Sequence, residues 1–168
     1  MDRIISKINI KDHIYPIYTL LFTLPGIPSV YYGSEWGIEG RKEGGNDNPL
    51  RPAVDVEEVL KQEKNSEILK WVQWLGNLHK KYRDCLAYGR YRELMLTNRQ
   101  YAFARFTQEQ GLVVAVNNDE QEANVSIPAP FENKVYINLE TGEPIPVENG
   151  RISLCMKPAG SVLIEIRE

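Results

Sequence analysis

Apolar residues along this chain follow three successive patterns. Between residues 12 and 24 they occupy nearly every position, which is typical of a helix covered by other parts of a protein. Between residues 66 and 88 they recur at steps of three and four, which predicts an amphipathic helix. From residue 89 the period changes to two, which predicts β-strands. The sequence therefore divides into a helical part, residues 1–88, and a β-domain, residues 89–168, an α+β fold class.

A short apolar run follows the first helix. Residues 29–32 include a β-branched residue and two tyrosines, which predicts a strand buried on both faces. A helix followed by a buried parallel strand is half of a repeating α/β unit, and such a strand needs partners on both edges. No other run in the chain is suited to be that partner. The polar, glycine-rich loop 33–52 comes next and is long enough to be either functional or disordered.

Two residues mark predicted helix boundaries. Asp12 precedes the first helix, where a carboxylate can accept hydrogen bonds from free backbone N–H groups and so cap the helix. Gly89 follows the second helix and is expected to end it in a left-handed conformation.

Seven short runs with strand character follow Gly89, and turn-forming residues separate them. The runs are Tyr91–Leu96, Tyr101–Thr107, Leu112–Asn117, Ala123–Ile127, Val135–Asn138, Arg151–Met156 and Ser161–Ile166. Alternation is clearest over residues 101–106, whose aromatic side chains are expected on one face of the sheet. Strands of this number and spacing predict an antiparallel β-sandwich.

Composition and charge exclude several classes of protein. The 168 residues are 42% apolar and 26% charged, an ordinary globular balance. The net charge of −3 gives no electrostatic case for nucleic acid or an anionic membrane surface as partner. No apolar run approaches the ~20 residues that span a membrane. No signal peptide is visible, so a cytoplasmic location is expected.

The residue types that metal or nucleophilic chemistry needs are sparse. Cys85 and Cys155 lie far apart without metal-ligand spacing and are expected to be packed, reduced thiols, although the sequence also permits a disulfide. His13 and His79 are also far apart, which supports neither a metal site nor a Ser–His pair. His79 lies on or beside an apolar stripe and is expected to pack in the core. We predict no metal and no cofactor.

The stretch PGIPSVYYGSEWGIEG, residues 25–40, resembles the last barrel strand of the α-amylase family of glycoside hydrolases, in particular its neopullulanase and cyclomaltodextrinase branch. In that family the segment leaves a helix, forms strand eight of a (β/α)8 barrel and delivers a loop to the sugar site. The resemblance implies that residues 1–88 are the C-terminal remnant of such a catalytic barrel, with residues 66–88 as its last helix. It implies that residues 89–168 are the family's C-terminal β-sandwich.

The resemblance also implies a sugar contact in loop 33–52. In the family an aspartate, and an arginine four residues later that precedes a proline, hydrogen-bond sugar hydroxyls; Asp47 and Arg51 reproduce this spacing. A carboxylate accepts from two adjacent hydroxyls, and a guanidinium donates in a fixed fork. From the residues alone, a solvated ion pair is the alternative. Trp36 is a candidate platform for stacking a sugar ring, or else a core residue, and Glu35 is expected to be a structural hydrogen-bonding residue.

The three catalytic carboxylates of the family have no counterpart in this chain. The family cleaves α-glucosidic bonds with retention, using a nucleophile, an acid–base residue and a third aspartate. By the resemblance all three map upstream of Met1, so the chain alone is expected to be inactive. It is expected to be the C-terminal portion of an α-glucan hydrolase, acting on starch, maltooligosaccharides or cyclodextrins, from a truncated gene or an expression fragment.

The alternative is a stand-alone carbohydrate-binding or protein-interaction module derived from such an enzyme. A fragment should leave the apolar helix 12–24 exposed, whereas an evolved module should cover it. The expected partners are an α-glucan oligosaccharide, bound weakly, and either the missing barrel or a second copy of the chain. An orphan strand and helix favour self-association over a monomer.

Overall fold

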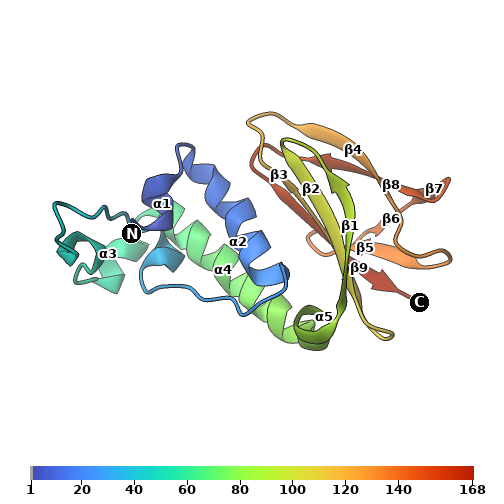
Figure 1. Ribbon diagram of the computed structural model, residues 1–168, viewed down its shortest axis with the longest axis horizontal. Helices are drawn as coiled ribbons and strands as arrows, with labels where there is room; N and C mark the ends of the chain where they lie inside the picture. The colour runs from blue at the N-terminus through green and yellow to red at the C-terminus, as the bar shows by residue number, and fades with distance from the viewer. Residues whose placement is uncertain (1) are drawn as a thin grey trace.

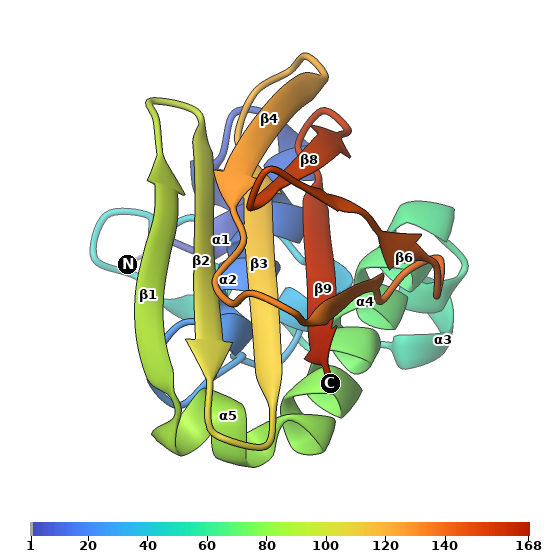
Figure 2. The same cartoon turned by 90° about the vertical axis from the view of Figure 1, so that its right-hand side faces the viewer.

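The computed structural model describes residues 2–168 and arranges them in three layers. A layer of helices packs on one face of a six-stranded sheet, and a three-stranded sheet covers the other face (Figure 1, Figure 2). The helices are α1 (Ile4–Lys7), α2 (Ile14–Thr23), α3 (Val56–Leu60), α4 (Glu63–Lys81) and α5 (Arg83–Tyr88). Short 3₁₀ turns lie at Lys11–His13, Ser34–Trp36 and Asn48–Leu50.

The first predicted helix is confirmed as α2, and its apolar character has the expected reason. Each of its residues is buried or half-buried, because α4 lies along one side and the large sheet along another. The capping prediction for Asp12 is wrong. Asp12 lies in the 3₁₀ turn before the helix, where its Oδ1 accepts from Lys64 Nζ on α4 at 2.8 Å instead of from the helix N-terminus.

The second predicted helix, residues 66–88, consists of two helices. The chain breaks at Tyr82, which has φ −104° and ψ 28°, so that α5 turns away from α4 toward the sheet (Figure 1). The left-handed conformation predicted for Gly89 is wrong, since its φ is −65°. Glycine is needed there for a different reason: a Cβ atom would lie 2.1 Å from the Cys85 carbonyl oxygen. His79 packs between α4 and α2, as predicted, with Nδ1 2.8 Å from Phe22 O.

The predicted strand at residues 29–32 does not form. These residues carry no regular strand structure and join neither sheet within the described chain. They are also not buried on both faces, because Tyr31 is 51% exposed and Tyr32 is 43% exposed. The physical reason is the missing neighbour: a parallel strand is stabilised only when adjacent strands accept and donate its backbone hydrogen bonds.

The β-sandwich prediction is confirmed. The large sheet has the order β1-β2-β3-β9-β5-β6 and the small sheet the order β4-β8-β7, and the recorded pairings are antiparallel. The strands are β1 (Arg90–Leu96), β2 (Gln100–Phe106), β3 (Gly111–Asn117), β4 (Ala123–Pro128), β5 (Val135–Asn138), β6 (Pro144–Ile145), β7 (Val147–Glu148), β8 (Arg151–Met156) and β9 (Ser161–Arg167). All seven predicted runs are strands, and the two-residue β6 and β7 are additional.

The centre of the large sheet, strands β2 and β3, is buried on both faces, which changes the interpretation of strand β2. Phe103 faces the helices, whereas Phe106 faces the small sheet, so the expectation that the aromatics share one face is wrong for Phe106. Ala102 and Ala104 are fully buried on the Phe106 side, because the small sheet approaches closely there. Figure 2 shows β4 and β8 in front of the large sheet and the helices behind it.

Arg105 on β2 joins the helical layer to the sheet. Its side chain is 1% exposed, and it points from the sheet toward the carboxyl ends of two helices. The carbonyl oxygens that accept from its guanidinium belong to Thr23 at 3.2 Å, Cys85 at 3.3 Å, Leu86 at 2.7 Å and Gly89 at 3.3 Å. The cation therefore satisfies carbonyl groups that helix termini leave free and lies at the negative end of each helix dipole.

Both cysteines are free thiols. Cys85 is buried, as predicted, and burial raises the pKa of its thiol to about 11. Cys155 is exposed on β8, so the prediction that it is packed is wrong. Across residues 2–168 no helix combines the length and apolarity that crossing a membrane requires.

Candidate functional site

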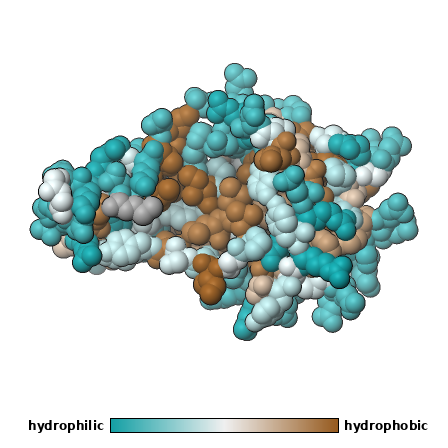
Figure 3. All heavy atoms as spheres, in the orientation of Figure 1, coloured by the Kyte–Doolittle hydropathy of each residue, from teal (hydrophilic) through white to brown (hydrophobic). Residues whose placement is uncertain are grey.

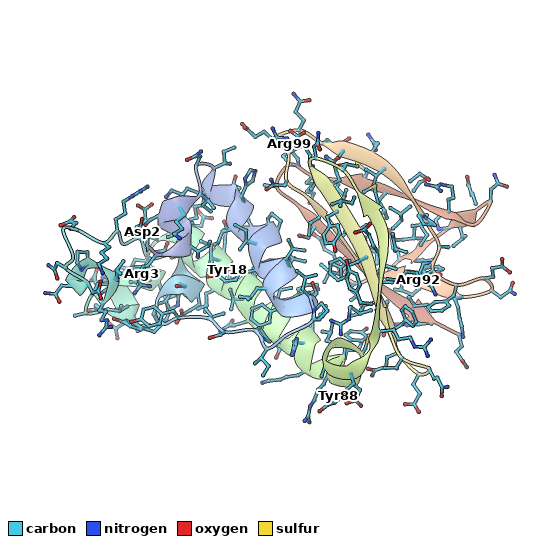
Figure 4. All side chains as sticks on the ribbon, viewed as in Figure 1. Asp2, Arg3, Tyr18, Tyr88, Arg92 and Arg99 are labelled. Atoms are coloured by element: carbon cyan, nitrogen blue, oxygen red, sulfur yellow. The ribbon has the colours of Figure 1, made fainter. Side chains whose placement is uncertain are left out.

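Asp47 and Arg51 line one cleft of about 600 Å³, here called the Asp47 cleft. Its walls come from the N-terminal turn, α2, the irregular segment before Gly33, and loop 33–52 (Figure 4). The apolar part of the lining includes Ile17, Leu21 and Val30. Apolar side chains gather over α2 and its junction with the sheet on the face drawn in Figure 3. An apolar wall with a few charged groups is the usual composition of a small-molecule site.

The Asp47 carboxylate is an ionised hydrogen-bond acceptor at the rim of the cleft. Its Oδ1 lies 3.1 Å from Lys42 Nζ, and this hydrogen bond and charge hold the pKa of the Asp47 carboxyl below its ordinary value. Asp47 precedes the 3₁₀ turn Asn48–Leu50, but its side chain does not cap that turn. The carboxylate is half-exposed, so it is open to a ligand from outside.

The Arg51 guanidinium is exposed and makes no side-chain hydrogen bond or ion pair within residues 2–168. The arrangement differs from the ion pair between Asp47 and Arg51 that the residues alone suggested, because Lys42 is the cation that pairs with Asp47. The cleft lining thus holds two carboxylates, Asp2 and Asp47, and three cationic side chains, Arg3, Lys42 and Arg51. Together such groups can accept hydrogen bonds from hydroxyl groups and donate to them.

Arg3 holds the loop that carries Asp47, and sequence reasoning missed it. Its side chain is only 5% exposed, with Nη1 donating to Tyr32 O at 2.9 Å and Nη2 donating to Leu50 O at 2.8 Å. Its backbone N–H donates to Gly40 O at 3.0 Å. The signal available in the sequence was an isolated arginine beside an isoleucine-rich segment, where a buried charge requires partners.

Tyr18 connects α2 to the same loop. Its hydroxyl donates to Ser34 O at 2.7 Å, and burial raises the pKa of Tyr18 to about 12. Figure 4 shows Asp2, Arg3 and Tyr18 at the helical end of the molecule. These contacts give the floor of the cleft a fixed backbone, while Asp47 and Arg51 remain at its accessible edge.

Trp36 is not among the residues that line the Asp47 cleft. It belongs to the 3₁₀ turn Ser34–Trp36, which packs on α4, and its indole ring is half-buried. Trp36 Nε1 and Glu35 Oε2 are buried and have no hydrogen-bond partner within residues 2–168. The structural hydrogen bond expected of Glu35 is therefore not seen at this atom. No group of three or more His, Cys, Asp or Glu side chains in this part of the chain is placed to hold a metal ion.

Comparison with known proteins shows which enzymes the chain resembles in sequence. Residues 91–163 match the model of the maltogenic amylase C-terminal domain. A cyclomaltodextrinase of Geobacillus thermopakistaniensis (strain MAS1) is 28% identical over 152 residues, which are 89% of this chain and 24% of that protein. Neopullulanase 2 of Thermoactinomyces vulgaris is 26% identical over 145 residues, which are 84% of this chain and 23% of that protein.

Solved structures of α-glucan enzymes share the fold. An α-amylase of Anoxybacillus superposes with a TM-score of 0.79 at 24% identity, covering 96% of this chain and 34% of that one. The cyclomaltodextrin glucanotransferase CldA superposes with a TM-score of 0.75 at 20% identity, covering 100% of this chain and 35% of that one.

The chain is therefore similar in fold to these enzymes and similar in sequence to the C-terminal segments of two glycoside hydrolases. These matches support a C-terminal part of an α-amylase-family enzyme of the cyclomaltodextrinase and neopullulanase branch. It spans about a quarter of the length of the curated relatives it matches.

Proposed function

We propose that this chain is the C-terminal portion of an α-glucan hydrolase that acts on starch, maltooligosaccharides or cyclodextrins. The observation that carries the proposal is the similarity to a cyclomaltodextrinase over 89% of the chain, which extends well beyond the β-domain. In this proposal residues 1–88 are the last part of a (β/α)8 barrel, residue 1 lying outside the described range, and residues 89–168 are the C-terminal domain.

The unpaired apolar segment before Gly33 supports the barrel proposal. Ile27 is 94% exposed and Tyr31 is 51% exposed, although both are residue types that proteins usually bury. In a closed barrel, neighbouring strands would cover this segment and pair its backbone. The same exposure favours association with the remaining barrel or with a second copy of this chain.

We propose that the Asp47 cleft contributes sugar contacts to that enzyme. The Asp47 carboxylate accepts hydrogen bonds from vicinal hydroxyls, and Arg51 donates to the same sugar from its free guanidinium. The proximity of both residues to one apolar-walled cleft supports this role. Trp36 does not line this cleft. We propose that it contacts sugar only if the sugar site of the complete enzyme is larger than this cleft.

The chain alone is proposed to lack hydrolase activity, because the family's catalytic carboxylates have no counterpart in it. A stand-alone binding module is the second candidate. One observation favours it: every residue of α2 is buried or half-buried, as expected of a module. The two candidates share the sugar contact and differ in whether a barrel is encoded with this chain.

Reading the DNA upstream of the Met1 codon, in the same frame, separates these candidates. An open frame encoding more barrel, with an Asn-His-Asp motif, supports the hydrolase. A start signal preceded by no barrel sequence supports the module and contradicts the hydrolase.

The sugar contact is tested on the 168-residue chain by calorimetric titration with maltoheptaose. Asp47→Ala and Arg51→Ala should each weaken binding about tenfold, since each removes charge-assisted hydrogen bonds. The matched controls Asp84→Ala and Arg99→Ala remove exposed charges that lie outside the cleft and should leave the Kd unchanged. Equal Kd values for all four variants would contradict the contact.

A further inference from the structure

A second cleft lies where α5 meets the end of the large sheet. It has a volume of about 810 Å³ and shares no lining residue with the Asp47 cleft. Tyr88, the last residue of α5, lies at the edge of this cleft and is 80% exposed. The next most exposed aromatic residue, Tyr31, is 51% exposed. Figure 4 shows Tyr88 at the outer edge of the molecule, below the helical layer. We call this the Tyr88 cleft.

An exposed tyrosine that makes no intramolecular hydrogen bond within residues 2–168 has a free aromatic face and a free hydroxyl. Such a side chain combines a flat apolar surface with a polar tip, and it is used where a ligand has both characters. A second aromatic ring, Phe131, also lines the cleft and is half-buried against Phe106 in an edge-to-face contact at 4.9 Å. The cleft therefore offers one open and one anchored aromatic ring.

The polar lining of the Tyr88 cleft is rich in both donors and acceptors. Gln110 donates through Nε2 to Lys81 O at 3.4 Å, but its Oε1 is buried and accepts no hydrogen bond within the described chain. A buried acceptor without a donor is energetically costly, by roughly 1–3 kcal/mol.

The charges in the cleft nearly cancel, and most are already paired. Four cationic side chains and three carboxylates line it. Glu165 is paired with Lys81 and Arg167, and Glu168 is paired with Lys134. Arg90 is the cation of this lining that forms no ion pair within residues 2–168. A cleft with so little uncompensated charge attracts neither a polyanion nor a polycation strongly.

From this combination of features we propose that the Tyr88 cleft binds a neutral polyhydroxylated ligand, with one sugar ring of an α-glucan stacked on Tyr88. The choice of α-glucan as the neutral ligand rests on the proposed function, whereas the neutral and amphipathic character of the ligand rests on the cleft itself. Hydroxyl oxygens of the stacked sugar would accept hydrogen bonds from the exposed Arg90 guanidinium.

Calorimetric titration of the 168-residue chain with maltoheptaose tests the proposal. Tyr88→Ala should weaken binding at one of two sites about fivefold to tenfold, as expected for a lost aromatic contact. Tyr88→Trp should retain that site, because it keeps a flat ring. Leu96→Ala, which also truncates a strongly exposed apolar side chain but lines neither cleft, should leave both sites unchanged. Because Tyr88 is so exposed, the truncated variant is expected to fold.

This experiment tests the two proposed sugar sites separately. If only Asp47→Ala and Arg51→Ala weaken binding, the Tyr88 cleft is not a sugar site and the proposed function stands. If only Tyr88→Ala weakens binding, the Tyr88 cleft is supported and the Asp47 contact is contradicted. If the chain binds an anionic sulfated oligosaccharide at Tyr88 in preference to maltoheptaose, or binds no glucan there, the inference is overturned.

Discussion

The helical layer and the β-sandwich bury their apolar side chains in different ways. In the sandwich, the inner faces of two sheets cover each other, and each long strand pairs its backbone with at least one neighbouring strand. In the helical layer, α2 and α4 satisfy their own backbones but need the outer face of the large sheet to cover their side chains. The segment that follows α2 has neither kind of support, since it pairs with no strand of the described chain.

This difference indicates how strongly each region depends on contacts with the other. The sandwich contains both faces of its own core, so it is expected to retain its fold when the helices open. The helical layer cannot bury Leu75 or Ile14 without the sheet or one another. Regions of a protein open with different free energies, and the layer with fewer independent contacts opens first.

Arg105→Met breaks the link between the two regions and should have the largest effect on stability. The substitution keeps an unbranched side chain, shorter than that of arginine, and removes the donors to four carbonyl groups. Because buried acceptors without donors cost free energy, we expect a loss of about 4 kcal/mol in the free energy of unfolding. Urea denaturation measures it. Arg99→Met, at an exposed position, should change stability by less than about 0.5 kcal/mol.

Leu75→Ala tests whether the helical layer opens before the sandwich. Leu75 on α4 is fully buried in the core cluster that contains the helices, so its truncation should cost about 3 kcal/mol. Hydrogen exchange should show a larger loss of protection in α2 and α4 than in β2 and β3. The matched variant Ile152→Ala, in the core between the sheets, should lower protection in the strands. Equal loss of protection everywhere in both variants would show that the two regions unfold as one unit.

Gly89→Ala acts at the junction of α5 and β1 and should cost about 2 kcal/mol. The added Cβ would lie 2.1 Å from Cys85 O and 2.9 Å from Phe106 O, both backbone atoms that cannot move independently. Gly76→Ala is the opposite control, because α4 leaves open space at that position. It should stabilise the protein by up to about 1 kcal/mol through helix propensity. Thermal unfolding of the two variants should shift in opposite directions.

Glu165 gives the smallest expected effect and a pH dependence. Burial alone raises the pKa of its carboxyl, but hydrogen bonds from Tyr82, Arg167 and Lys81 together hold that pKa below its usual 4.5. A carboxyl whose folded-state pKa is lowered stabilises the fold above the unfolded-state pKa, and this contribution is lost as the pH falls through the folded-state pKa.

Glu165→Gln should therefore cost about 1 kcal/mol at pH 7 and nothing in strong acid. Urea midpoints measured between pH 7 and pH 3 should converge for wild type and variant below about pH 4.5. Glu168→Gln, whose side chain is 95% exposed, should follow the wild type throughout. A constant difference between Glu165→Gln and wild type at every pH would contradict the assigned pKa direction.

Local patterns predicted much of the fold because they depend on neighbouring residues. The period of two after Gly89 identified all seven longer strands, and the period of three to four identified α4 and α5. The break at Tyr82 was not predicted, since apolar positions continue across it and α5 turns only to meet the sheet. Two-residue strands β6 and β7 are too short to carry a period at all.

The candidate site was only partly predictable. The spacing of Asp47 and Arg51 was readable from the chain, and the structure brings both residues to one cleft. Lys42 as the partner of Asp47 and Arg3 as the anchor of the loop required contacts between residues far apart in sequence. The Tyr88 cleft likewise combines residues of α5 with residues of the β-domain, and no local motif in the sequence predicts it.

The sequence by itself determined which segments are helices or strands and that the β-domain has antiparallel character, because alternation of apolar side chains is a property of a single segment. Only the tertiary structure decided which faces are covered. β2 is buried on both sides because helices and a second sheet meet there. Residues 29–32 form no strand, and both of their tyrosines stay exposed. Burial and backbone pairing both need a neighbour, and the neighbour is supplied by the fold.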